Sequence, residues 1–391
     1  MRIFRPVLLL TISSSTLLCL PAPAQNSGGE QGVSLGDIAR QNRRSKQAAD
    51  TTPPGDKKAI DAGSSATNNA SAAVAKVEGD VDYQYNIRTL LVLDRFEALD
   101  KAAAEERSSK ARGQGGVWTL YLLYEAIIVP AGSGSSGDEE WNAHIAKLKN
   151  WTIARPQSIT ARVALAEAYL SWAWQARGSG YAEKVTDQGW ELFGSRVEQA
   201  QRILLEAAKL PEHCPMWYES MQQVALAQGW DKARARALLD QAIAFEPKYY
   251  HFYREYTNFL LPRWYGDDGE AETFVKEVSK RVGGQEGAFL YFELATVITC
   301  HCDSDSEVMA RLSWDKIKAG YTALQQSYGT SDLKMNRFAY MAYLVGDRTA
   351  ARPVFEQLGP RWEQTIWKNK TRFEEARTWS NEAQVQGALT R

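Results

Sequence analysis

The chain has 391 residues, with 46 Lys and Arg against 47 Asp and Glu, which leaves a formal net charge of -1. No overall positive field is therefore available to recruit nucleic acid or an anionic membrane, and we expect neither as a partner. Apolar residues make up 44% of the chain and there are 13 Trp, enough for a large core in about two domains or in one elongated repeat array.

The first 24 residues are typical of an export signal. Arg2 and Arg5 precede a short apolar run, and Ala22-Pro23-Ala24 places small residues at the cleavage positions. The apolar run is shorter than the ~20 residues that span a bilayer. We therefore expect cleavage after Ala24, a periplasmic or secreted location, and no membrane insertion of the mature chain.

Residues 25–80 have the composition of a linker. They are rich in Ser, Gly, Ala, Asp, Asn and Lys and contain few large apolar residues. Such a segment cannot bury enough apolar surface to offset the entropy lost on ordering, so the sequence predicts a disordered tether. Within it, residues 34–47 form a basic amphipathic stretch that fits either a transient helix or a docking motif.

Residues 81–391 have apolar side chains at helical spacing and no convincing period of two, which predicts an all-α domain. The first two helices are expected over residues 87–107 and 117–129. Asp138 is a plausible N-cap of the next helix, after a Gly- and Ser-rich break.

A repeat is indicated by three helices, residues 197–210, 231–246 and 349–358, each of which is followed by a proline. The stretch "GWDKARARALLDQAIAFEP" resembles the second half of a tetratricopeptide repeat. Gly229 lies at the turn, Ala235 where the two helices approach most closely, and Pro247 at the end. The spacing from Pro211 to Pro247 is near the period of about 34 residues. We expect a tetratricopeptide-like α-solenoid of about six helical hairpins.

One hairpin is interrupted by the insertion, residues 176–196, which we expect to act as a lid or a second contact. Together with "LPRWYGDDGE" and "GWDKAR", the insertion is similar to an uncharacterised family of exported bacterial helical-repeat proteins, a domain-of-unknown-function family of the 4034 type. The resemblance covers roughly residues 82–361. It implies a tetratricopeptide-like fold and, because the family has no assigned activity, it implies no catalytic residue.

The aromatic stretch at residues 249–270 divides into two parts. Six apolar side chains follow helical spacing on one face and are predicted to be core: Tyr249, Phe252, Tyr253, Tyr256, Phe259 and Leu260. Pro262 ends this helix. Asp267 and Glu270 then predict a capping box for the following helix. The acidic run lacks the ligand spacing of a calcium loop.

Partner-binding candidates are the polar and aromatic residues outside that stripe, because Trp, Tyr and Arg anchor interfaces and loops on a rigid scaffold often bind. They are Arg177, Tyr181, Trp190 and Arg196 in the insertion, Tyr250 and Arg254 on the helix, and Arg263, Trp264 and Tyr265 in the turn. The alternative is that the Trp residues plug hairpin ends and the Arg residues cap carbonyls. If Trp264 binds a partner, its replacement by Ala should weaken binding and change stability little.

Three cysteines lie beyond the signal, at Cys214, Cys300 and Cys302. In an oxidising compartment the simplest expectation is one disulfide, from Cys214 to Cys300 or Cys302, with unpaired cysteines as the alternative. No C-x-x-C spacing is present, so we expect no metal site.

The sequence contains no motif of a serine hydrolase, zinc protease, phosphate loop or dinucleotide fold, and we expect neither a cofactor nor an enzyme. The favoured interpretation is a monomeric scaffold that binds an unidentified protein or peptide through its concave face. A hydrolase that uses the insertion carboxylates Glu183, Asp187 and Glu191 stays open, as does a purely structural envelope component.

Overall fold

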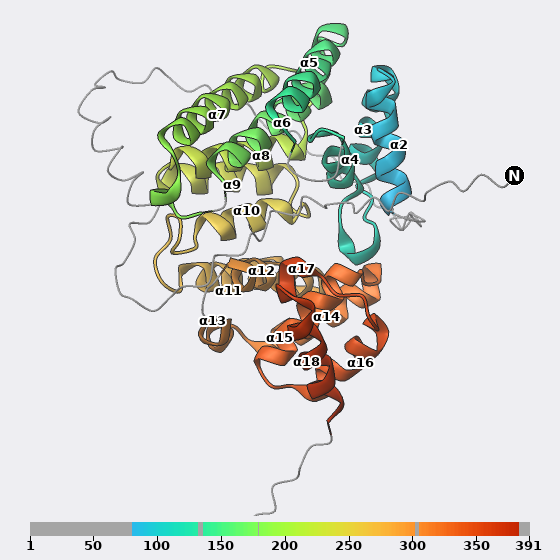
Figure 1. Cartoon of the computed structure of the whole chain (residues 1–391), viewed down its shortest axis with the longest axis vertical. Helices are drawn as coiled ribbons and strands as arrows, with labels where there is room; N and C mark the ends of the chain where they lie inside the picture. The colour runs from blue at the N-terminus through green and yellow to red at the C-terminus, as the bar shows by residue number, and fades with distance from the viewer. Residues whose placement is uncertain (1–79, 132–135, 179, 302–304, 383–391) are drawn as a thin grey trace, which may run out of the picture.

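The computed structural model describes residues 80–131, 136–178, 180–301 and 305–382 (Figure 1). The predicted signal peptide and all but the last residue of the predicted tether lie outside these ranges. Within them the chain is helical, and its one extended pairing is an isolated bridge between Arg112 and Trp118. The predicted all-α class is confirmed for this part of the chain.

The N-terminal helices begin with α2. Their bounds are α2 Asp80–Val92, α3 Phe96–Ser109, the 3-10 turn η1 Gln114–Gly116, α4 Thr119–Ile127, α5 Asp138–Ala154, α6 Ile159–Arg177, the 3-10 turn η2 Ala182–Lys184, α7 Asp187–Ala207, α8 Pro215–Gln228 and α9 Lys232–Phe245.

The C-terminal helices follow without a strand between them in the described ranges. They are α10 His251–Phe259, α11 Glu270–Val282, α12 Gly284–His301, α13 Asp305–Arg311, α14 Trp314–Tyr328, α15 Asp332–Leu344, α16 Arg348–Leu358, α17 Gln364–Trp367 and α18 Lys370–Asn381.

Side-chain caps fix many of the helix starts. Ser158, Thr186 and Asp231 each accept a hydrogen bond from the amide three residues later, at the beginning of α6, α7 and α9. Two predicted caps are displaced. Gly137, not Asp138, is the N-cap of α5, so Asp138 is the first helical residue.

The capping box predicted for α11 is also different in detail. Gly269 is the N-cap, in the left-handed conformation with φ 76°. The Glu270 carboxylate still accepts a hydrogen bond from the amide of Asp267, at 2.8 Å. Asp267 therefore lies two residues before the cap rather than at it.

Consecutive helices pack in pairs, among them α6 with α7, α8 with α9, and α15 with α16. Helices α6, α8, α10 and α12 lie side by side in this order, and α15 joins α12 through side-chain contacts described below. We call these five helices the inner row. Ala235 and Ala242 are buried as predicted, which lets α8 and α9 approach closely.

The predicted aromatic stripe of α10 is core. All six of its side chains are at most 6% exposed, from Tyr249 to Leu260. They belong to a hydrophobic cluster that extends from α8 to α18 and includes Trp118, while a second cluster extends from α2 to α9. The helical spacing therefore identified the buried face correctly.

The described residues of the insertion are largely helical. Helix α6 continues to Arg177, and α7 begins at Asp187 rather than at Val197. Trp174 on α6 meets Phe193 on α7 edge to face, with ring centroids 5.0 Å apart. Residues 187–196 thus lengthen α7, and this extension packs on the end of α6 through the Trp174–Phe193 contact.

Candidate functional site

Most of the residues predicted to bind a partner are buried. Trp264 is only 7% exposed and packs edge to face on Trp174, with ring centroids 5.7 Å apart. The turn after Pro262 folds back, and the Tyr265 hydroxyl donates to the Leu226 carbonyl at 2.9 Å. Because Trp264 and Tyr265 pack back into the core, the expectation that the turn presents these two side chains at a surface is wrong.

The two insertion arginines also point inward and satisfy carbonyl groups. Arg177 donates to the carbonyls of Gly178 and Gly180, both at 2.9 Å, and burial together with nearby Arg263 lowers its pKa to about 10. The Arg196 guanidinium lies 3.6 Å from the centre of the Trp172 ring and donates to the Trp172 carbonyl. These contacts match the alternative in which arginines cap carbonyls and tryptophans fill hairpin ends.

The remaining predicted residues are spread over different environments. Tyr181 and Arg263 are exposed, Trp190 is half-buried, Tyr250 is buried, and Arg254 enters a polar cluster. The carboxylates proposed for a hydrolase are exposed: Glu183, Asp187 and Glu191. They therefore lack the burial that normally tunes catalytic carboxyl groups.

A polypeptide segment that the sequence marked only as a connection packs on α12 and α15 at one end of the inner row. We call residues 111–118, between α3 and α4, the covering segment. Figure 1 shows this loop reaching from α4 toward the C-terminal helices, and η1 within it packs on α14. Arg112 donates to the Tyr328 hydroxyl at 2.8 Å and pairs with Glu286 at 3.2 Å. The segment therefore joins the N-terminal and C-terminal helices.

The covering segment is attached near α10 as well. Arg112 and the Trp118 indole both donate to the Lys248 carbonyl, at 2.6 and 3.2 Å. Gly115 and Gly116 have φ near +75°, and a Cβ added at Gly115 would lie 2.8 Å from Ser331 Oγ. Only glycine allows this backbone to lie so close to α15.

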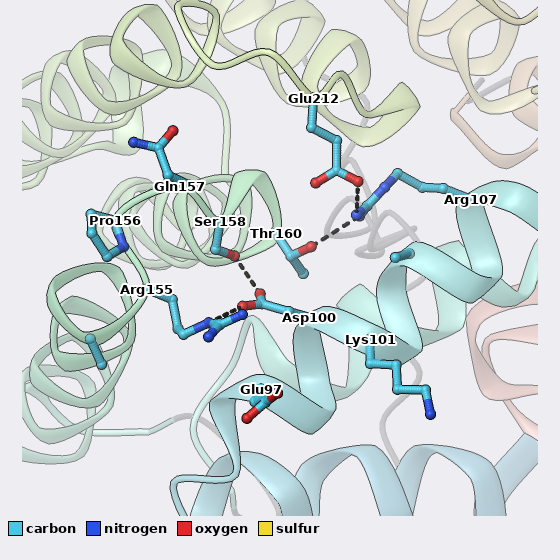
Figure 2. Close-up of a pocket in the computed structure, with 12 residues that line it drawn as sticks. Glu97, Asp100, Lys101, Arg107, Arg155, Pro156, Gln157, Ser158, Thr160 and Glu212 are labelled. Atoms are coloured by element: carbon cyan, nitrogen blue, oxygen red, sulfur yellow. Dashed lines mark hydrogen bonds and ion pairs between the residues drawn. The ribbon is translucent and has the colours of Figure 1, made fainter.

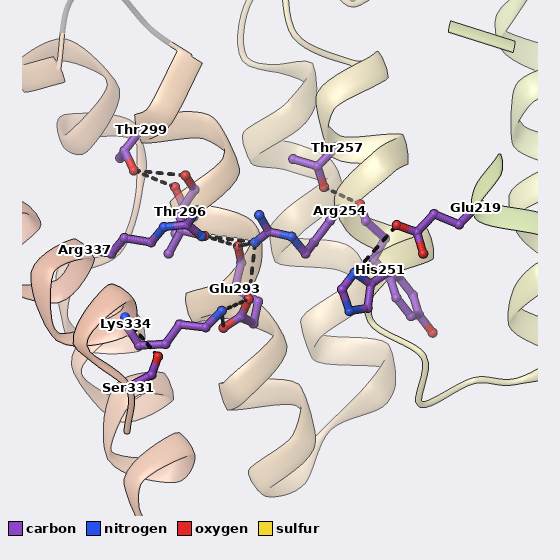
Figure 3. Close-up of polar contacts among 12 residues, drawn as sticks. Glu219, His251, Arg254, Thr257, Glu293, Thr296, Thr299, Ser331, Lys334 and Arg337 are labelled. Carbon is purple, nitrogen blue, oxygen red and sulfur yellow. Dashed lines mark hydrogen bonds and ion pairs between the residues drawn. The ribbon is translucent and has the colours of Figure 1, made fainter. Parts of the chain in front are cut away.

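A basic cluster lies beneath the segment, in the inner row. Figure 3 shows Arg254, Lys334 and Arg337 converging on Glu293 and Thr296. Lys334 Nζ is 2.6 Å from Glu293 Oε2, and Arg254 Nη1 is 3.2 Å from the same oxygen. Burial alone would raise the pKa of Glu293, but Lys334 and Arg254 hold it below its ordinary value.

Helices α4, α6, α8 and α10 contribute a second polar group, which we call the carboxyl cluster: Glu125, Glu167, Glu219 and Glu255, none more than 8% exposed. Burial, reinforced by the neighbouring carboxyl groups, raises the pKa of Glu125 and Glu255 to about 8 and that of Glu219 well above its ordinary value. Burial likewise raises that of Glu167 to about 7. In the described part of the chain, no such set of residues is arranged to hold a metal ion.

His251 lies between the two groups. Its Nδ1 is 3.7 Å from Glu219 Oε1 (Figure 3). Its ring is stacked between Tyr121 and Tyr250, with ring centroids 4.0 and 4.3 Å away. Burial lowers its pKa well below the ordinary value, and the nearby cations Arg254, Lys334 and Arg112 act in the same direction. The imidazole is therefore neutral, and its Nε2 has no hydrogen-bond partner among the described residues.

An open cleft of about 600 Å³ lies on the outside, between α3, the turn before α6 and the turn before α8 (Figure 2). Asp100 accepts hydrogen bonds from Ser158 Oγ and from Arg155 Nε, the latter at 2.9 Å. Arg107 donates to Thr160 Oγ1 at 2.9 Å and to Glu212 at 2.6 Å. The cleft is thus walled by charges of both signs in fixed positions.

Cys214 is a free, buried thiol in the structure, and its sulfur lies 3.4 Å from the Tyr124 hydroxyl. This does not agree with the disulfide expected from Cys214. The side chain of Cys300 and the whole of Cys302 lie outside the described residues. Burial raises the pKa of the Cys214 thiol.

Sequence reasoning missed both polar groups, although a signal was present. Glu125, Glu167 and Glu293 each interrupt an otherwise apolar helical run, as in "LYLLYEAII" and "FLYFELATV". A lone charge in such a run is either exposed at a kink or buried with partners. Recognising the second case required knowing which helices are neighbours.

The fold and the site define an all-helical protein with ionisable groups buried along a row of neighbouring helices. Residues 84–230, which extend from α2 to just beyond α8, match the family model described as Domain of unknown function (DUF4034). This match supports the predicted resemblance over that part of the chain. No curated protein matches the chain significantly. Among the described helices, none combines the length and the apolar content that a membrane crossing requires.

Proposed function

We propose that the protein is an exported scaffold, a tetratricopeptide-like α-solenoid, that binds a protein or peptide partner in the cell envelope. The observation on which this proposal depends is the open cleft between α3 and the turns before α6 and α8. Its volume of about 600 Å³ lies within the range of ligand sites, about 300–1,000 Å³.

The lining favours a polypeptide over a small molecule. Small-molecule sites are mostly apolar and aromatic, whereas this cleft contains no aromatic residue. Arg107 and Arg155 face carboxylates across it and are already held by hydrogen bonds, so binding would require little further ordering of the walls. Charges of both signs suit a segment with both acidic and basic side chains.

A substitution that fills the cleft provides the test. Ala104 is exposed on α3 and lines the cleft, while Ala237 is exposed on α9 and is not part of the cleft lining. Envelope extract is passed over immobilised wild-type protein, Ala104→Trp and Ala237→Trp. We expect a stoichiometric partner to be retained by the wild type and by Ala237→Trp and lost with Ala104→Trp.

Two results would contradict the proposal. Equal retention by Ala104→Trp would move the partner site away from the cleft. Absence of any stoichiometric partner on all three proteins would reject the scaffold function itself. Circular dichroism of each variant establishes that the folds are the same.

A further inference from the structure

The cleft is one part of a longer edge along the inner row. Helices α6, α8 and α10 are neighbours in this row, and the turns before α6 and α8 both border the cleft, where Arg107 on α3 pairs with Glu212 at 2.6 Å (Figure 2). One helical turn after Arg107, Lys110 at the end of α3 pairs with Glu246 in the turn before α10, at 2.5 Å. Helix α3 therefore leads from the cleft to the next turn along the same edge.

An aromatic surface lies beside this third turn. It consists of His213, Tyr218 and Phe245, and we call it the aromatic platform. Phe245 is the last residue of α9 and is 39% exposed, and its ring centroid lies 5.4 Å from that of Tyr218 and 6.3 Å from that of His213. Because His213 directly follows Glu212 in the chain, the platform begins where the lining of the cleft ends.

We propose that the partner held in the cleft is an extended polypeptide segment that continues past Glu212 and places an aromatic or large aliphatic side chain on the aromatic platform. This inference rests on the proposed function, because it takes the cleft to be the site of a polypeptide. It gives the segment two parts, namely charged residues of both signs and one large apolar residue at a fixed distance from them.

The cleft and the platform select different side chains. The cleft lining contains charges of both signs and no aromatic residue, which suits charged side chains. The platform instead offers the rings of Tyr218 and Phe245, on which an aromatic side chain gains contact energy beyond the area that it buries. Of the aromatic residues that the structure describes, only Tyr85 and Tyr181 are exposed to a similar or greater extent than Phe245, and neither lines the cleft. A segment that crosses both surfaces therefore needs an apolar anchor as well as charges.

The geometry limits the spacing between the two parts of the segment. Neighbouring Cα atoms are about 3.8 Å apart, and the His213 and Phe245 ring centroids are separated by 6.3 Å. The step from Glu212 to Phe245 is therefore short, on the order of 10 Å. Because an extended chain rises about 3.3 Å per residue, we expect the apolar anchor roughly three to five residues from the charged residue that faces Glu212.

Selection from a library of random peptides displayed on phage, with the full chain immobilised, tests the proposal. We expect the wild type to enrich peptides that carry charges of both signs and one aromatic or large aliphatic residue at a constant spacing from them. A synthetic peptide of the enriched consensus is then titrated by isothermal calorimetry. Phe245→Ser should weaken its binding by about 2- to 10-fold, the range for loss of one aromatic contact. Tyr85→Ser removes an exposed aromatic residue on α2 and should bind as the wild type.

A double-mutant cycle identifies the contact itself. When the apolar anchor of the peptide is replaced by Ala, Phe245→Ser should have no further effect on its affinity. Circular dichroism and thermal melts establish that the variants fold. If Phe245→Ser does not fold, Phe245→Gln, which keeps more of the side-chain length, is read in its place.

The outcomes separate this inference from the proposed function. Loss of binding in Ala104→Trp together with equal affinity of the wild type and Phe245→Ser would overturn the platform and leave the cleft as the site. Enriched peptides without an apolar residue at a constant position would have the same meaning. Failure of the wild type to enrich any peptide, or full binding by Ala104→Trp, would reject a polypeptide site in the cleft and this inference with it.

Discussion

Replacing Trp264 by Ala tests the role of the turn after α10 directly. The side chain is 7% exposed, lies in the larger hydrophobic cluster and packs on Trp174. A buried Trp side chain removes roughly 150–250 Å² from water, worth about 4–6 kcal/mol at ~25 cal/mol/Å². Substitutions of this kind cost about 3–5 kcal/mol in practice. We therefore expect a loss of about 4 kcal/mol in the free energy of unfolding.

That loss translates into a measurable thermal shift. With an unfolding entropy of about 2.1 cal/mol/K per residue over roughly 300 residues, 4 kcal/mol lowers Tm by about 6 °C. Differential scanning calorimetry of Trp264→Ala measures it, with Leu205→Ala on the exposed face of α7 as the control, because exposed substitutions stay within about 0.5 kcal/mol. A shift below about 2 °C for Trp264→Ala would refute the core assignment and restore the turn as a binding surface.

Two further predictions follow from the buried groups. The free energy of unfolding should fall as pH rises from 5 to 9. The carboxyl groups of the carboxyl cluster have raised pKa values in the folded protein, so their stabilising contribution is complete below about pH 4.5 and is lost as pH rises through about 7 to 8. A urea midpoint that rises from pH 5 to pH 9 would contradict this prediction. Gly115→Ala should destabilise the protein by about 1–3 kcal/mol more than Gly269→Ala. Both glycines have φ near +75°, but only Gly115 lies against Ser331. Equal urea midpoints for the two variants would show that the covering segment does not pack closely on α15.

The sequence predicted the α10 core well because helical spacing alone determines which face is buried. From Tyr249 to Phe259 the apolar residues repeat on one side, and no knowledge of neighbours is needed. The turn after Pro262 is different. A proline ends the helix reliably, but whether the next side chains face solvent depends on how the backbone returns, here with the Tyr265 amide bonded to the Phe259 carbonyl.

The extent of α7 could have been predicted and was not. Thr186 followed by Asp187 is an N-cap signal, and the Thr186 hydroxyl does accept from the Gly189 amide. The glycines that follow Arg177 favour a loop, and the insertion was therefore not predicted to be helical. The carboxyl cluster, by contrast, depends on helices far apart in the sequence, from Glu125 to Glu255, so no local pattern predicts that these residues meet.

The covering segment also affects the order in which the chain can fold. Most helices contact near neighbours in the sequence, but the Arg112 bond to Tyr328 spans 216 residues. At synthesis rates of about 5–20 residues per second, Arg112 would emerge roughly 10–40 s before its acceptor. The first helices must therefore persist without this closure, and long-range closures of this kind slow folding. Once formed, the same contact joins the N-terminal helices to α14, so that local opening of either part also requires this bond to break.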